Sequence, residues 1–210
     1  LLSVLLMPCL VEAGAWPRDA GKGFLSGAVR LSWPQDLADW TSVRPTQDYQ
    51  TLYLEYGLTE RITLGFDIGR SVSGGSKTVA FAQVPLRDKD TGPKLSAQLG
   101  FGQISGDMVL RPGLSIGWGM SHGWLTFDAH LNDGATDYKL DATWGRNFAE
   151  DWKAILQLQT GVQHSDPPFV RLAPSLVTPV GRGFKTEMGV TYGITGDSSM
   201  GLKIGFWLDF

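Results

Sequence analysis

The sequence predicts an all-β fold: a single closed antiparallel transmembrane β-barrel of about twelve strands with short turns. Three observations lead to this prediction. Apolar residues alternate with polar or small residues in segments of roughly ten residues. Clusters of Gly, Pro, Asp, Asn and Ser separate these segments, as tight turns require. Beyond residue 15, no apolar run approaches the roughly 18 residues of a membrane helix, so strands must cross any membrane.

The N-terminal region has the features of a signal peptide. The first ten residues, LLSVLLMPCL, are nearly all apolar, and VEAGA follows with small residues at Ala13 and Ala15. We therefore expect a signal peptide at 1–15 and a barrel at 16–210; the alternative is a buried N-terminal helix or strand. Cleavage after Ala15 would remove Cys9, the only cysteine of the chain, so the mature protein would have no disulfide.

Charge and length limit the classes of function. The chain carries 18 Lys and Arg against 21 Asp and Glu, a net charge of −3, so it has no basic field for nucleic acid. Its 210 residues suffice for one domain. We expect a monomer with no nucleic-acid partner.

Twelve segments carry the alternation. They are residues 23–33, 49–57, 61–71, 77–86, 94–103, 108–118, 123–132, 137–147, 153–163, 169–180, 184–195 and 200–210. In the third segment, one face carries Ile62, Leu64, Phe66 and Ile68, and the other carries Thr63, Gly65, Asp67 and Gly69. A soluble sandwich would show the same alternation with the apolar face inside. The signal peptide and the C-terminal strand favour the membrane barrel, with its apolar face outward.

An even number of strands places both chain ends on the periplasmic side. The periplasmic turns are then 57–61, 87–93, 119–123, 147–152 and 181–183, and the outer loops are 34–48, 72–76, 104–107, 133–136, 164–168 and 196–199. The longest outer loop is a candidate to fold over the mouth and form a constriction with Asp36, Asp39, Arg44 and Asp48. The segment 77–86 alternates poorly, and prolines interrupt three strands, so we expect bulges at Pro85, Pro112 and Pro174.

The C-terminal run GLKIGFWLDF ends on an aromatic residue and places five apolar residues on one face: Leu202, Ile204, Phe206, Leu208 and Phe210. This run resembles the terminal insertion signal of Gram-negative outer-membrane β-barrel proteins. The segment EYGLTERITLGFDIG at 55–69 resembles the hairpins of the same barrels. The resemblance is to an architecture and brings no catalytic or binding residues. It implies the cell outer membrane as location, with outer-membrane lipids and the barrel-assembly machinery as partners.

Function is most readily sought in the lumen, where the alternation places both signs of charge. The expected lumen-lining residues are Arg30, Glu55, Asp67, Arg111, Asp128, Lys139, Asp141, Arg171, Glu187 and Lys203. They favour a passive channel or transporter for a small solute, with a narrow mixed-charge lumen. The alternative is a structural or envelope-interaction barrel that the same ion pairs close. Inward glycines such as Gly65, Gly69, Gly113 and Gly117 favour the open lumen.

A third alternative is a lipid-modifying enzyme that uses His130. The neighbourhood FDAHLND does not match the His-x-Ser-Asn arrangement of barrel lipases, and the alternation directs His130 into the lumen. We therefore expect no enzyme activity and no catalytic residue. The three histidines are scattered along the chain, so we expect no metal site, and no motif indicates a cofactor.

Overall fold

A computed structural model describes residues 14–72, 75–89, 91–132, 137–148, 151–162 and 167–210. Residues 1–13 of the expected signal peptide and the expected loop 133–136 lie outside this part of the chain. The strands are β1 (Gly23–Pro34), β2 (Gln47–Thr59), β3 (Ile62–Ser71), β4 (Ser76–Arg87), β5 (Lys94–Ile104), β6 (Asp107–Met120), β7 (Gly123–Leu131), β8 (Tyr138–Phe148), β9 (Trp152–Val162), β10 (Phe169–Gly181), β11 (Phe184–Thr195) and β12 (Ser199–Asp209). None of the described helices is long and apolar enough to cross a bilayer.

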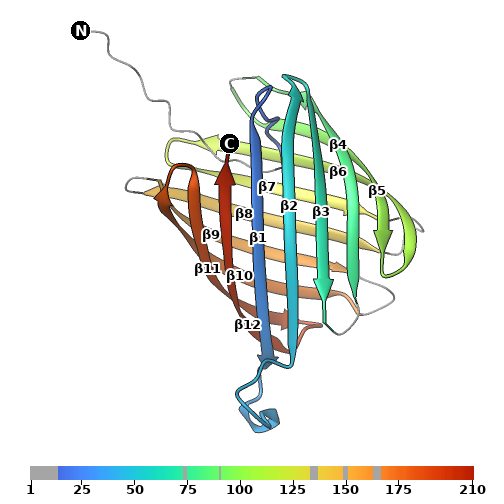
Figure 1. Ribbon diagram of the computed structural model, residues 1–210, viewed down its shortest axis with the longest axis vertical. Helices are drawn as coiled ribbons and strands as arrows, with labels where there is room; N and C mark the ends of the chain where they lie inside the picture. The colour runs from blue at the N-terminus through green and yellow to red at the C-terminus, as the bar shows by residue number, and fades with distance from the viewer. Residues whose placement is uncertain (1–13, 73–74, 90, 133–136, 149–150, 163–166) are drawn as a thin grey trace.

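Each strand pairs with its neighbours in the sequence, and β1 pairs with β12 (Figure 1). The closing ladder is antiparallel and runs from Phe24 opposite Asp209 to Pro34 opposite Ser199. Closure leaves no strand edge whose backbone groups would lack partners in lipid. The predicted fold class and number of strands are confirmed.

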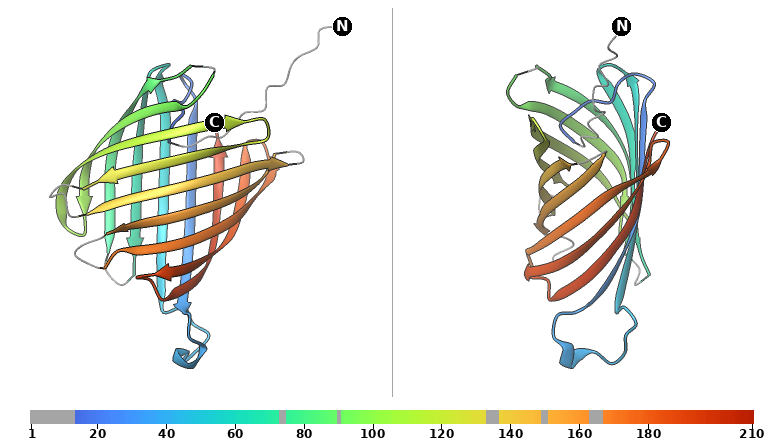
Figure 2. Two further views of the ribbon diagram at one scale, coloured as in Figure 1. Left: turned by 180° about the vertical axis from the view of Figure 1, so that it is seen from behind. Right: turned by 90° about the vertical axis from the view of Figure 1, so that its left-hand side faces the viewer.

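The two ends of the barrel differ. Both ends of the described chain lie at one end, which we call the turn end, and the β1–β2 connection lies at the opposite end, which we call the loop end (Figures 1 and 2). In outer-membrane barrels the short turns face the periplasm. The β1–β2 loop contains a short 3₁₀ helix (Leu37–Asp39) and extends away from the barrel. The expectation that it folds over the mouth is therefore wrong, although Asp48 at its end does line the lumen.

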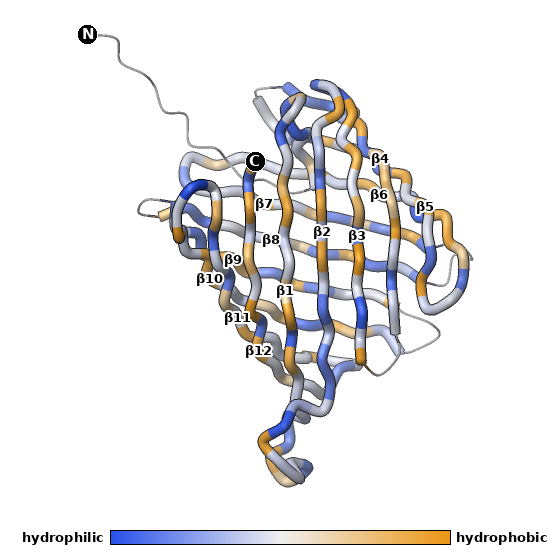
Figure 3. The backbone as a smooth tube through the Cα atoms, viewed as in Figure 1, coloured by the Kyte–Doolittle hydropathy of each residue, from blue (hydrophilic) through white to orange (hydrophobic). Residues whose placement is uncertain are grey.

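All twelve strands carry exposed apolar side chains. Apolar and polar residues alternate along the strands (Figure 3). Leu99 and Phe101 of β5 are 54% and 60% exposed, and Ile204 of β12 is 55% exposed. Their inward neighbours are polar or small. In water, so much exposed apolar surface would cause association, whereas a bilayer solvates it. The structure thus agrees with the membrane barrel and excludes the sandwich with an apolar interior.

Four apolar residues of the C-terminal run, from Leu202 to Leu208, share the outward face of β12, because the inward positions 203, 205 and 207 pair with inward positions 30, 28 and 26 of β1. Phe210 follows the last residue of β12 and is exposed. This placement would present the four residues of the strand to lipid. Its recognition by the assembly machinery stays a prediction.

Only one of the three expected proline bulges is present. The β4–β5 register shifts between Pro85 and Arg87, as predicted. Pro112 lies opposite Leu99 without a shift, and the pairing of β6 with β7 begins one residue later, at Gly113. Pro112 therefore lies just beyond the paired part of β6 and β7. Pro174 lies in regular register opposite Leu156 of β9.

Candidate functional site: the barrel lumen

The lumen contains a cavity of about 860 Å³, to which all twelve strands contribute lining residues. The cavity extends to the loop end, where Ser105 and Gly196 line it. Toward the turn end, its lining stops at the aromatic residues Phe24, Trp124 and Trp207. The lumen is therefore a vestibule that reaches one end of the barrel.

The structure places the ten sequence-predicted lumen residues on inward faces. Eight of them line the cavity: Arg30, Asp67, Arg111, Asp128, Lys139, Arg171, Glu187 and Lys203. Glu55 and Asp141 are buried beside it, at 1% and 8% exposure. Sequence reasoning missed other charged groups of the interior, namely Arg18, Lys77, Lys153, Lys185, Asp197 and Asp209. Four of these missed groups lie at or just inside strand ends, where the alternation within one segment does not predict which way a side chain points. Arg18 and Asp197 lie outside the strands.

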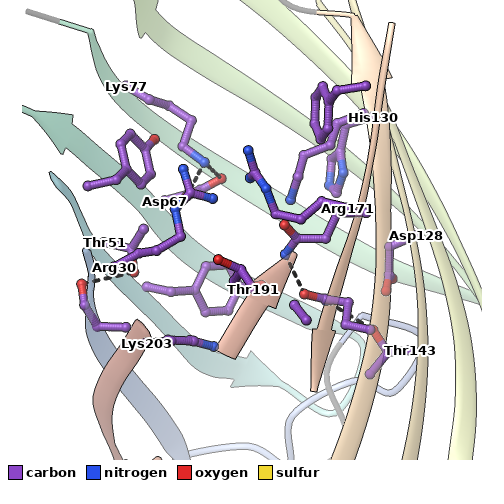
Figure 4. Close-up of a pocket in the computed structure, with 18 of the residues that line it drawn as sticks. Arg30, Thr51, Asp67, Lys77, Asp128, His130, Thr143, Arg171, Thr191 and Lys203 are labelled. Carbon is purple, nitrogen blue, oxygen red and sulfur yellow. Dashed lines mark hydrogen bonds and ion pairs between the residues drawn. The ribbon is translucent and has the colours of Figure 1, made fainter. Parts of the chain in front are cut away.

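Asp67 on β3 is the centre of one ion-pair network. Its carboxylate accepts hydrogen bonds from Lys77 Nζ at 2.8 Å and Arg111 Nη1 at 2.6 Å. Figure 4 shows Lys77 and Asp67 meeting on one wall of the cavity. Two cations thus share one carboxylate, which leaves this wall with an excess of positive charge.

Glu187 on β11 is the centre of a second network. It accepts hydrogen bonds from Ser175 Oγ at 2.7 Å, Lys203 Nζ at 2.7 Å and Trp207 Nε1 at 3.0 Å. A buried carboxylate with three donors is fully compensated, so these partners fix its position.

Arg30 on β1 lacks such compensation. Its Nε atom is buried without a hydrogen-bond partner among the described residues, and its guanidinium lies 5.7 Å from the centre of the Tyr49 ring. Its neighbour on β12 is Lys203, directly opposite in the register. Arg171 on β10 repels Arg30 electrostatically and Asp197 attracts it without forming an ion pair. All three cations project into the cavity (Figure 4). We call Arg30, Arg171 and Lys203 the cationic cluster.

Asp197, in the β11–β12 connection, holds Arg171 in place. Arg171 Nε donates to its carboxylate at 2.6 Å, and the backbone N–H and hydroxyl of Ser199 donate at 3.0 and 2.6 Å. Partial burial raises the pKa of Asp197, but the hydrogen bonds from Ser199 and the charge of Arg171 outweigh this effect. The pKa of Asp197 therefore lies below its usual value, and the loop-end ion pair persists to acidic pH.

His130 lies in the cavity lining, where its Nε2 forms a 3.0 Å hydrogen bond with Oε1 of Gln98. Across the described ranges, no group of three or more His, Cys, Asp or Glu residues could hold a metal ion. Within the described residues, His130 therefore has the Gln98 amide as its hydrogen-bond partner and belongs to no metal-binding cluster.

The segment from Gly14 to Lys22, which we call the N-terminal strap, crosses the turn end: residues 14–18 are buried or half-buried inside it, and residues 19–22 are exposed. Arg18 forms an ion pair with Glu55 at 2.7 Å, and its backbone N–H donates to Thr63 Oγ1 at 3.0 Å. The Gly14 carbonyl accepts from Gln83 Nε2 and Ser96 Oγ, both at 2.7 Å. The strap therefore has partners on β2, β3, β4 and β5. Together with the aromatic floor of the cavity, it occupies the bore that the cavity does not reach.

The inward glycines do not open the bore as expected. A side chain at Gly65 would meet the Phe81 ring, at Gly69 the Tyr49 hydroxyl, at Gly113 the His130 ring and at Gly117 the Trp16 ring. Each space is already filled by a bulky neighbour. These glycines accommodate large side chains from adjacent segments, so glycine content alone does not predict an open lumen.

Several solved structures share this fold. No family model and no curated protein matches the chain. The structure is similar to the KdgM porin in complex with disordered oligogalacturonate, with a TM-score of 0.68, 12% identity, and 88% of this chain and 99% of that chain covered.

Two further solved structures are similar. The COG4313 outer membrane channel from Pseudomonas putida F1 has a TM-score of 0.58 and 10% identity over 95% of this chain and 99% of that chain. An active-site mutant of outer membrane phospholipase A from Escherichia coli has a TM-score of 0.51 and 12% identity over 92% of this chain and 91% of that chain. At such identities the likeness shows the fold alone: the chain has the architecture of outer-membrane β-barrel porins and channels.

Proposed function

We propose that this protein is a passive outer-membrane channel for small solutes, with a narrow mixed-charge lumen that favours anions. The observation that carries the proposal is the cavity of about 860 Å³, which is lined by charged and polar side chains and reaches the loop end. A lumen of this kind hydrates a small polar solute along its path.

The preference for anions follows from the cationic cluster. Arg171 and Lys203 have carboxylate partners, in Asp197 and Glu187, whereas Arg30 forms no ion pair among the described residues. The similar KdgM porin is described in complex with oligogalacturonate, which is itself a polyanion. An anionic solute would supply the counter-charge that Arg30 lacks.

A closed structural or envelope-interaction barrel is the second candidate, and the N-terminal strap favours it. The strap and the aromatic floor fill the turn end, so solute passage requires the strap to move. The lipid-modifying enzyme receives no such support, because His130 faces the lumen, away from lipid acyl chains.

The test compares two chains in planar bilayers, one that begins at Trp16 and one that lacks residues 16–21. We expect small stepwise currents from the first chain and larger steps from the second, because the deletion empties the turn end. Heat-modifiable mobility on gels would establish that both chains are folded. Folded chains with no current from either one would identify the closed barrel and contradict the channel.

A further inference from the structure

We propose that Asp128 and Asp141 form a binding site for the α-ammonium group of Trp16, which cleavage after Ala15 creates. The site would fix the N-terminal strap inside the turn end. The inference rests on the expected cleavage site and on the contacts of the strap, and it does not require that solutes pass through the barrel.

The two carboxylates are direct neighbours. Asp128 on β7 lies opposite Asp141 on β8, and both face inward. Asp141 has one cationic partner, Lys139. The Oδ1 atoms of both residues are buried and have no hydrogen-bond partner among the described residues. Carboxylates at directly opposite positions repel each other, and buried acceptors without donors are costly. Ser115 and Thr126 form hydrogen bonds with the Asp128 carboxyl group, so the pair lacks one cation and a donor for each of the two Oδ1 atoms.

The strap brings the expected cleavage site to this pair. A side chain at Gly14 would lie 2.1 Å from Asp128 Oδ1, so the Gly14 backbone packs directly on that carboxylate. Ala15 is completely buried. The Trp16 ring packs over Gly117 of β6, which is two residues from Ser115, the neighbour of Asp128 in the register. The Ala15–Trp16 peptide bond is thus enclosed by the barrel wall near the two carboxylates.

This burial also sets the order of events. A peptidase cannot reach a bond that the folded barrel encloses, so cleavage has to precede folding. Hydrolysis consumes one water molecule, leaves a carboxylate on Ala15 and creates an amino group on Trp16. The released peptide takes Gly14 and Ala15 with it, and this vacates the space beside Asp128.

The new group matches what the pair lacks. An α-amino group has a pKa of about 7.7–8.0, so it is largely protonated at neutral pH and carries three N–H donors. With Lys139 it brings two positive charges to two carboxylates. The ammonium would donate to the free Oδ1 atoms, and its charge-assisted hydrogen bonds would hold the strap by its first residue.

The experiment compares chains that begin at Trp16 with a free or an acetylated α-amino group. Mass spectrometry of the exported protein first establishes the mature N-terminus. Both chains are then refolded in detergent, and trypsin cleavage after Arg18 measures how often the strap leaves the barrel. We expect cleavage to be about tenfold faster in the acetylated chain, a factor typical of a lost charge-assisted hydrogen bond.

Two variants show whether the acidic pair is responsible. In an Asp128→Asn, Asp141→Asn chain, acetylation should no longer change the cleavage rate, whereas Asp107→Asn, at the loop end of β6, should preserve the tenfold difference. Heat-modifiable mobility confirms that each chain is folded. Equal cleavage of the free and acetylated chains would overturn the proposal, and so would a mature N-terminus other than Trp16. Both outcomes are independent of channel currents, so failure of this site and failure of the channel are distinguishable.

Discussion

Removal of the charge of Arg30 should reduce the preference of the channel for anions. Arg30 projects into the cavity and forms no ion pair among the described residues, so its field acts on the solution in the lumen. Glutamine keeps a polar side chain, although a shorter one, without the charge. Arg30→Gln therefore removes one charge from the cationic cluster and leaves the Glu187 network intact.

The magnitude follows from the distance of closest approach. An ion that passes about 5 Å from the guanidinium gains about 0.8 kcal/mol in bulk-like water and about 3 kcal/mol at an effective dielectric constant of about 20. The smaller value applies to a hydrated lumen and corresponds to about fourfold in anion occupancy. A cation loses a repulsion of the same size, which is another factor of about four, so the ratio of anion to cation permeability should fall by about sixteenfold.

The assay is the reversal potential in a KCl gradient across a planar bilayer, measured on the chain that lacks residues 16–21 if the full chain conducts too little. Arg70→Gln is the matched control, because Arg70 lies on the outward face of β3 and is exposed. The control should leave the reversal potential unchanged. An unchanged potential in Arg30→Gln, with normal conductance, would refute the assignment of anion preference to this residue. Because salt screens the field over about 10 Å at 0.1 M, the shift should be greatest at low salt.

Three further predictions concern other parts of the barrel, and a fourth concerns its assembly. Gly117→Leu should displace Trp16, whose ring fills the space over this glycine, and should increase proteolysis of the strap without loss of heat-modifiable mobility. Asp197→Asn should lower the thermal unfolding midpoint at pH 7. Because the folded pKa of Asp197 is below the unfolded value of about 3.9, this difference should be full above that value and shrink as the pH falls below it, as scans at a series of pH values would show. Ile204→Arg should destabilise the barrel by about 2–4 kcal/mol if Ile204 lies near the bilayer midplane, measured by denaturant titration in lipid against Ile204→Val. Phe210→Ala should slow assembly in cells while refolding in detergent stays normal; equal assembly rates would argue against the insertion signal.

The fold was predictable because most strands alternate apolar residues, which face lipid, with polar or small residues, which face the lumen. In β3, every outward position from Ile62 to Ile68 is apolar and every inward one is polar or small. β4 breaks this rule, and the reason lies in its neighbours. Val79 and Phe81 face inward, where they fill the spaces over Gly100 and Gly65 on the adjacent strands. The period of one strand cannot reveal such complementarity, because it arises only when the register brings a bulky residue beside a glycine.

The site was predictable in part for the same reason. Inward direction follows from alternation, so the structure places the ten expected charged residues on inward faces. The ion pairs do not follow from alternation. Arg111 and Asp67, for example, are 44 residues apart in the sequence and form their hydrogen bond inside the lumen. The strap was missed because Arg18 lies outside any strand, and nothing in its sequence neighbourhood indicates Glu55 as a partner.

The chemistry of the turn end supports a strap that can leave the barrel. A bore that is closed permanently is filled more favourably by well-packed apolar side chains, because the dehydration of ion pairs is costly. Yet the strap is held by the Arg18–Glu55 ion pair, and Lys185 and Asp209 form another at the same end. Water can solvate each of these charged groups if the strap moves out, and the Trp16 ring is the large hydrophobic surface of the strap that such a movement would expose. Polar anchoring therefore lowers the cost of opening, which is the property that a channel requires and a structural barrel does not.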